Sequence, residues 1–169
     1  MTGQIKIIRE TRLDPRFPLS RQELAELALV IMNFFGFGED SFSIKLVDDL
    51  EIARLNEEFL GCSGPTNVLS FPAEGDAQAD SPEVAVNGGD SVSRDSDDPV
   101  FLGELALSVD ALSREADLYG QPPVGHLARL LAHGILHLAG YDHGDEMYEL
   151  TDGAVERVLL EYTEWSERE

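Results

Sequence analysis

Three of the four histidines of this chain fall within eleven residues, in the segment His133-Gly-Ile-Leu-His137-Leu-Ala-Gly-Tyr-Asp-His143. His133 and His137 are four residues apart, so in a helix they lie on one face, about one turn from each other. Gly140 then permits the left-handed backbone of a sharp helix exit. We therefore expect a helix that ends near Gly140 and a turn that brings His143 back to the other two histidines.

Three converging imidazoles are typical of a catalytic zinc site. Imidazole nitrogens bind zinc at about 2.0–2.1 Å, and a three-histidine site leaves the fourth tetrahedral position open for water. Water bound there has a pKa of about 7, so hydroxide is available at neutral pH. Cys62 is the only cysteine, and an all-nitrogen set favours zinc, with nickel or copper as alternatives in vitro. We predict that one zinc ion per chain is bound by His133, His137 and His143 and activates water for hydrolysis.

Two further polar residues lie close to this segment. His126 precedes His133 by seven residues, which is about 10 Å along a helix axis and too far to share the ion. We interpret His126 as a partly exposed helix residue. Asp142 directly precedes His143 and is the candidate catalytic residue, either as a partner that orients a ligand or as the general base; a turn-capping role is the alternative.

The spacing H-x3-H-x5-H is also that of the metzincin proteases. Their general base is the glutamate that follows the first histidine, and in this chain that position is Gly134. Met147 follows His143 too closely for a Met-turn, and we predict that it belongs to the core. Proteolysis by the metzincin mechanism is therefore disfavoured.

The charge of the chain is strongly negative, with 33 acidic and 12 basic residues and a net charge of −21. Such a charge repels polyphosphates at long range, which argues against a general nucleic-acid binder and against a DNA partner. A local basic strip remains possible near the start of the chain, where Arg9, Arg12, Arg16 and Arg21 occur. Residues 74–100 contain eight acids and one base and no apolar period, and we expect them to form a disordered insertion.

The hydropathy pattern predicts four strands and five helices. The strands are expected at 4–10, 41–47, 67–71 and 101–108, and the helices run from Ser20 to Gly36, from Asp48 or Asp49 to about Phe59, and over about 110–120, 122–140 and 145–165. This order predicts an α+β fold, in one domain over residues 1–169, with a single central mixed sheet of about four strands packed with about five helices. No apolar run approaches the roughly 18 residues of a membrane span. The lone Cys62 and the lack of a secretory signal favour the cytoplasm.

The histidine segment HGILHLAGYDH resembles the signature of the YbeY family of bacterial endoribonucleases and rRNA maturation factors, H-G-x-L-H-L-x-G-Y-D-H, at every fixed position. Residues 65–72, PTNVLSFP, are similar to the family's P-T-D-V-L-S-F-P, and residues 102–108, LGELALS, to its L-G-D-I-x-I-S. The resemblance covers nearly the whole chain except 74–100. It implies an α+β fold, a zinc ion held by the three histidines, and a single-strand-specific endoribonuclease that acts in 16S rRNA 3′-end maturation and ribosome biogenesis. The implied partners are rRNA, the small ribosomal subunit and its proteins.

Two positions depart from the family pattern. Where the family usually has L-N-x-x-Y-R-G, this chain has LNEEFLG, so Leu60 replaces an arginine that would hold a phosphate or stabilise developing charge. Asn67 replaces the family's aspartate. Arg54, Arg12 and Arg16 are candidates for the missing cation.

Three functions are therefore open at this point. The leading one is a zinc-dependent endoribonuclease. The loss of the arginine at Leu60 motivates a second, a non-catalytic ribosome-assembly factor with a structural zinc. The third is a metal-dependent hydrolase of another ester or amide, against whose protease form Gly134 argues.

Overall fold

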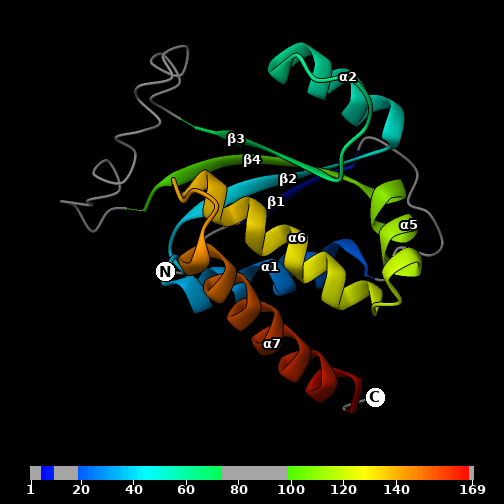
Figure 1. Ribbon diagram of the computed structural model, residues 1–169. Coiled ribbons are helices and arrows are strands. Elements are labelled where there is room, and N and C mark those ends of the chain that lie inside the picture. The colour runs from blue at the N-terminus through cyan, green and yellow to red at the C-terminus, as the bar shows by residue number, and fades with distance from the viewer. Residues whose placement is uncertain (1–4, 10–18, 74–98, 168–169) are drawn as a thin grey trace.

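A computed structural model describes residues 5–9, 19–73 and 99–167 of the chain, with the side chains of residue 9 and of the last few residues left out (Figure 1). Nearly all of the predicted insertion, residues 74–98, lies outside the described residues. The same holds for Arg12 and Arg16, two of the candidates for a cation near the histidines.

The centre of the fold is a mixed sheet of four strands in the order β1-β2-β4-β3. Its strands are β1 (Ile5–Arg9), β2 (Ser41–Val47), β3 (Val68–Pro72) and β4 (Phe101–Ser108). β1 and β4 both run parallel to β2, whereas β3 pairs with β4 in the antiparallel direction. The third strand was expected to end at residue 71, and it extends to Pro72. A proline is tolerated there because β3 is an edge strand, where one side needs no ladder partner.

Five helices accompany the sheet in the described part of the chain: α1 (Arg21–Phe35), α2 (Asp49–Leu60), α5 (Val109–Tyr119), α6 (Pro123–Leu138) and α7 (Asp145–Glu167). Helix α2 covers one face of the sheet, and α1, α6 and α7 lie on the other (Figure 1). The predicted α+β fold with one mixed sheet of about four strands and about five helices is confirmed. None of the described helices combines the length and the apolar character that crossing a membrane requires.

The helix starts follow from local capping chemistry. The predicted capping box is present at α1, where the Ser20 Oγ accepts from the Glu23 N–H at 3.1 Å and Glu23 accepts from the Ser20 N–H at 2.9 Å. Asp48 caps α2. Helix α5 was expected to begin at Asp110, but its cap is Ser108, whose Oγ accepts from the Ala111 N–H. The Asp110 carboxylate instead accepts from the Asp49 N–H and so joins α5 to α2.

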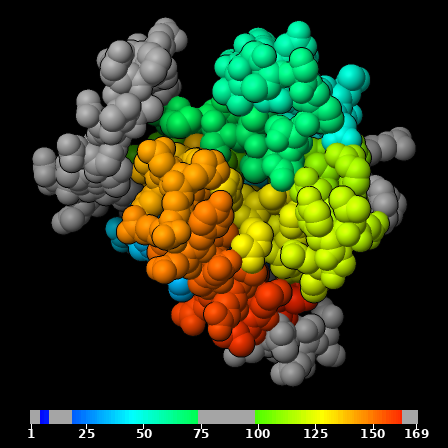
Figure 2. Space-filling view, viewed as in Figure 1, coloured from blue at the N-terminus to red at the C-terminus, as the bar shows by residue number. Residues whose placement is uncertain are grey.

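Two hydrophobic clusters lie on the two faces of the sheet. The larger one joins the sheet to α1, α6 and α7 and includes Leu105 and Leu107 of β4. The smaller one joins α2 to the opposite face, where Leu69 and Ala106 are buried. Met147 of α7 is buried, as predicted for a core residue. Helix α6 is therefore held between the sheet and α7, and yellow atoms of α6 reach the surface between α5 and α7 (Figure 2).

Candidate metal centre

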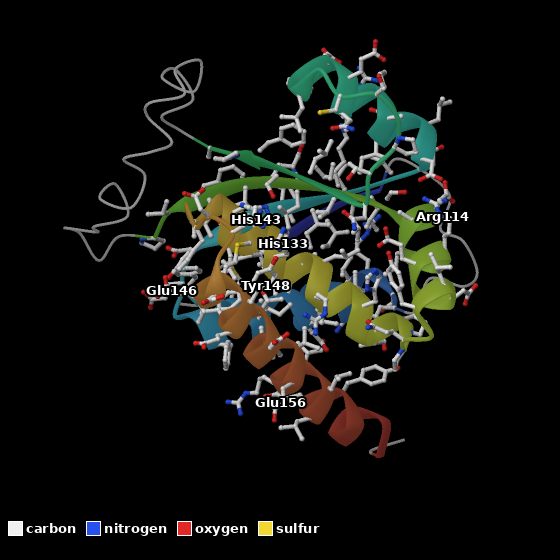
Figure 3. All side chains as sticks on the ribbon, in the orientation of Figure 1. Arg114, His133, His143, Glu146, Tyr148 and Glu156 are labelled. Carbon is white, nitrogen blue, oxygen red and sulfur yellow. The ribbon has the colours of Figure 1, made fainter. Side chains whose placement is uncertain are left out.

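The three histidines of the segment converge at the end of α6 (Figure 3). One ring nitrogen of each of His133, His137 and His143 lies within 4.8 Å of the other two, so the group could hold a metal ion. The Nε2 atoms of His133 and His137 are 3.1 Å apart. His133 and His137 are half-buried, whereas His143 is exposed. The arrangement therefore presents two fixed nitrogens and one on a loop at the surface.

The loop after α6 explains how His143 reaches the helix. Gly140 has a φ of 98°, a left-handed conformation that side chains rarely adopt. Its N–H donates to the His137 carbonyl at 3.0 Å, and the Tyr141 N–H donates to the Leu136 carbonyl at 2.9 Å. These two bonds fold the chain back against the end of the helix. The predicted turn at Gly140 is thus confirmed.

A backbone carbonyl orients one of the candidate ligands. The Nδ1 of His137 lies 3.2 Å from the Tyr141 carbonyl oxygen, and this contact is a hydrogen bond when Nδ1 carries the proton. Nε2 then has its lone pair free for a metal. The orienting role that was considered for Asp142 is thus filled, for His137, by the neighbouring carbonyl. Asp142 itself is exposed, and its role as a base stays a prediction.

The electrostatics of the cluster favour the neutral form of its two helix histidines, His133 and His137. Burial, followed by the neighbouring His137 and His143, lowers the pKa of His133 to about 4. Burial and His143 also lower the pKa of His137, against smaller opposing effects of the Tyr141 carbonyl and the Asp142 charge. A metal binds the neutral imidazole. At pH 7 both helix histidines are therefore in the state that a metal requires.

Gly134 is packed against the sheet and has no room for a side chain. A Cβ atom at this position would lie 2.8 Å from Cδ2 of Leu105. Gly134 is buried, on the side of α6 that faces β4. A glutamate in the metzincin arrangement therefore fits here neither sterically nor by charge, which gives a structural reason for the absence of the protease base.

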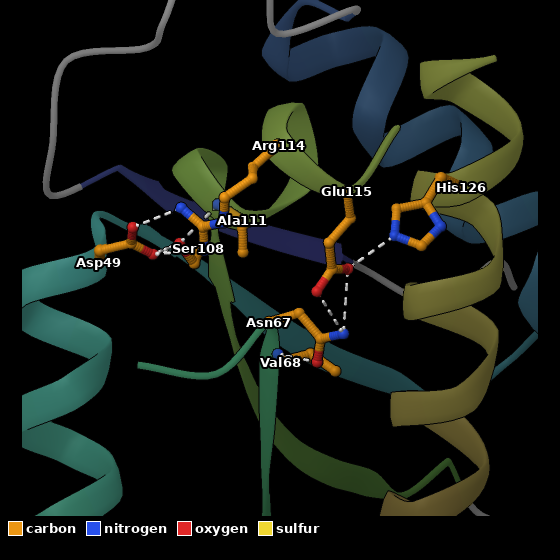
Figure 4. A network of polar contacts seen from close by, with 8 residues as sticks. All are labelled: Asp49, Asn67, Val68, Ser108, Ala111, Arg114, Glu115 and His126. Carbon is orange, nitrogen blue, oxygen red and sulfur yellow. Dashed lines mark hydrogen bonds and ion pairs between the residues drawn. The ribbon is translucent and has the colours of Figure 1, made fainter. Parts of the chain in front are cut away.

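His126 is not the partly exposed residue that we expected; that prediction was wrong. It is only 6% exposed, and its Nε2 lies 2.8 Å from Oε1 of Glu115 on α5 (Figure 4). The ring of Tyr119 packs edge-on against it. The covering residues come from α5, so a helical pattern in α6 alone cannot reveal them. His126 is not part of the group of three histidines, in agreement with its predicted separation from them.

Asn67, one of the departures from the family pattern, belongs to the same network. Its Nδ2 donates to Glu115 at 3.2 Å (Figure 4), and its Oδ1 accepts from the Val68 N–H at 2.7 Å. An aspartate here would place a second carboxylate beside Glu115. The amide of Asn67 thus complements this neighbour.

The other departure, Leu60, is 60% exposed at the end of α2. Arg54, a candidate for the missing cation, pairs with Glu51 at 2.8 Å and with Glu58 at 2.6 Å on the surface of its own helix. Its guanidinium is therefore already bound by two carboxylates on α2.

The fold and the site together define an α+β protein with a three-histidine candidate metal centre. The family model described as endoribonuclease YbeY matches residues 16–162, and the chain belongs to this family. A relative named endoribonuclease YbeY from Oleidesulfovibrio alaskensis is 48% identical over 141 residues, which cover 80% of this chain and 81% of the relative. Another of that name, from Nitratidesulfovibrio vulgaris, is 43% identical over 148 residues, which cover 88% and 90%.

The fold is also found in a solution structure of a protein from Thermotoga maritima. The match has a TM-score of 0.61 and covers 98% of this chain and 95% of that one, at 24% sequence identity. The similarity shows that the two proteins share the fold.

Proposed function

We propose that this chain is a zinc-dependent endoribonuclease, specific for single-stranded RNA, that acts in the cytoplasm in the maturation of the 16S rRNA 3′ end. The small ribosomal subunit and its proteins are the proposed partners. The observation that carries the proposal is the convergence of His133, His137 and His143, in a chain whose relatives are named endoribonucleases.

The three histidines would hold the zinc ion through their ring nitrogens, and zinc bound there supplies Lewis acidity towards a phosphate oxygen and lowers the pKa of a bound water. His137 is oriented for this by the Tyr141 carbonyl. His133, whose pKa is about 4, offers a neutral nitrogen throughout the physiological pH range. Asp142 is exposed beside His143, and we propose that it accepts a proton from the attacking water.

The charge of the chain supports a dependence on a partner. With a net charge of −21, long-range attraction of RNA is absent, and Leu60 offers no cation for a phosphate. We propose that the ribosomal subunit presents the RNA to the site, so that affinity for isolated RNA is weak.

The test is cleavage of a single-stranded RNA that contains the 16S 3′ end, together with the zinc content of the purified protein. We expect one zinc per chain, and we expect His137→Ala to lose the zinc and to reduce cleavage by at least about a hundredfold. Arg129→Ala is a matched control on the exposed side of the same helix, and it should leave both values unchanged. Undiminished cleavage by a zinc-free His137→Ala protein would contradict the proposal.

Leu60 favours a second candidate, an assembly factor without catalysis whose zinc is structural. The variant Leu60→Arg separates the two, because a restored cation can stabilise charge only where a reaction takes place. An endoribonuclease should become about tenfold faster or more. Association with the subunit, without cleavage by either protein, would favour the second candidate.

A further inference from the structure

The outer edge of β3 presents an unusual set of backbone groups. The Ser108 N–H donates to the Asn67 carbonyl at 2.9 Å, and the Ala73 N–H donates to the Leu102 carbonyl at 3.0 Å. In an antiparallel pair, hydrogen-bonded residues alternate along the strand. With the observed register, Leu69 and Phe71 therefore direct their backbone groups towards β4. The backbone groups of Val68, Ser70 and Pro72 point the other way, to the free edge.

This free edge is rich in acceptors and poor in donors. The N–H of Val68 is taken by the Asn67 side chain, and Pro72 has no N–H. Among the described residues, three carbonyl oxygens and a single N–H, that of Ser70, remain without a partner at this edge. The carbonyl oxygens of alternate residues are about 6.8 Å apart along a strand. An added peptide strand needs donors and acceptors in alternation, so this edge is poorly suited to bind a polypeptide.

The edge lies beside the candidate metal centre. The Ser70 Oγ donates to the carbonyl of Gly134 at 3.3 Å, and Gly134 directly follows His133. The labelled His133 and His143 lie below the β3–β4 edge of the sheet in Figure 3. A chain that runs along the edge of β3 would therefore lie near the part of α6 that carries His133.

We propose that the outer edge of β3 binds an extended single-stranded ribonucleotide chain through its 2′-hydroxyl groups, which donate to the carbonyl oxygens of Val68, Ser70 and Pro72. This inference rests on the proposed function and names the feature by which the site selects RNA over DNA. The 2′-hydroxyl is the donor that RNA has and DNA lacks. Carbonyl acceptors repel phosphates but accept from hydroxyls, which agrees with a chain of net charge −21.

The test uses the zinc-loaded chain, labelled with ¹³C and ¹⁵N, and three hexauridylates that carry 2′-hydroxyl, 2′-deoxy or 2′-O-methyl sugars. A phosphorothioate backbone in all three slows any cleavage. We expect the ribonucleotide to shift the carbonyl ¹³C resonances of Val68, Ser70 and Pro72. Those of Leu69 and Phe71, which already face β4, are matched controls and should stay in place. The deoxy and methyl oligonucleotides should bind at least about tenfold more weakly than the ribonucleotide, because neither can donate a hydrogen bond from the 2′ position.

Equal carbonyl shifts with the deoxy oligonucleotide would overturn the inference, as would an absence of shifts or a response to an extended peptide alone. Cleavage of unmodified RNA, measured in parallel, separates this inference from the proposed function. Cleavage without carbonyl shifts overturns the edge contact and leaves the nuclease proposal standing. Carbonyl shifts without cleavage support the edge contact and contradict the nuclease proposal.

Discussion

Helix α6 carries histidines in two different environments, one at its start and one at its end. His126 is buried and directs Nε2 to the carboxylate of Glu115. His133 and His137 direct their Nε2 atoms towards each other. A carboxylate at hydrogen-bond distance gives a histidine a structural partner, whereas two imidazoles that face each other leave lone pairs for an ion. All three histidines lie on one helix. The comparison therefore shows that the groups around each imidazole ring, and not the helix itself, determine the role of that histidine.

The two environments also differ in what surrounds the ring nitrogens. The Nδ1 of His126 is buried without a hydrogen-bond partner among the described residues, so a proton there would be an unsatisfied donor. The contact with Glu115 thus favours a proton on Nε2, which donates to the carboxylate. At the other end of the helix, a proton would compete directly with a metal.

The sharpest test of this comparison is metal binding. His133→Ala and His137→Ala should each weaken zinc binding by about a hundredfold or more, because each removes a proposed ligand. His126→Ala should change zinc affinity only a few-fold. Competition with a chromophoric chelator measures all three. Equal losses in the three variants would break the distinction between the two ends of α6.

The packing of Gly134 predicts the largest change in stability. Gly134→Glu should lower the free energy of unfolding by more than about 3 kcal/mol, because it forces a charged side chain against Leu105. Urea denaturation of the metal-free protein measures this value. Gly144→Ala is the control, since a Cβ there meets nothing within 4 Å, and its effect should be within about 0.5 kcal/mol of zero. A stable Gly134→Glu protein would contradict the packing argument.

A smaller loss of stability is expected at the start of α6. His126→Ala should lower the free energy of unfolding by about 1–3 kcal/mol, because Glu115 loses a partner and the ring leaves a space. His143→Ala, at an exposed histidine, should cost less than about 0.5 kcal/mol in metal-free protein. The same urea experiment compares them, and a similar cost for both would contradict the structural role of His126.

The smallest expected effect is a dependence of stability on pH. The pKa of His133 is about 4 in the folded chain and 6.5 without its surroundings, so the unfolded chain binds more protons between these values. The stability of the metal-free protein should therefore be highest above pH 6.5 and fall as the pH is lowered towards 4. The variant His133→Gln should show a shallower fall in urea midpoint over this window. An unchanged dependence of the urea midpoint on pH would show that a group other than His133 causes it.

The features that the sequence predicted correctly depend on neighbours along the chain. The spacing of His133 and His137, the turn at Gly140 and the capping box at Ser20 are all local patterns, and the structure contains each of them. The mixed sheet followed from the order of strands and helices. The zinc ion and the role of Asp142 remain predictions.

The features that the sequence did not reveal depend on residues distant in the chain. His126 is covered from α5. Asp110 does not cap its own helix because its carboxylate binds the Asp49 N–H across 61 residues. The pairing of Asn67 with Glu115 likewise joins β3 to α5. Such contacts follow from how the elements pack, which no periodicity in one segment contains.

The contact between Gly134 and Leu105 has a consequence for how this site can change over evolution. A glutamate gained at position 134 by a single substitution would press against Leu105 and should lower the stability of the chain before any new chemistry could be selected. We expect the effects of substitutions at the two positions to depend on each other, because a smaller residue at Leu105 would make room for the glutamate, at its own cost to the core. In this chain, a change from one kind of three-histidine site to the other should therefore pass through a less stable protein, even though the histidine spacing is the same.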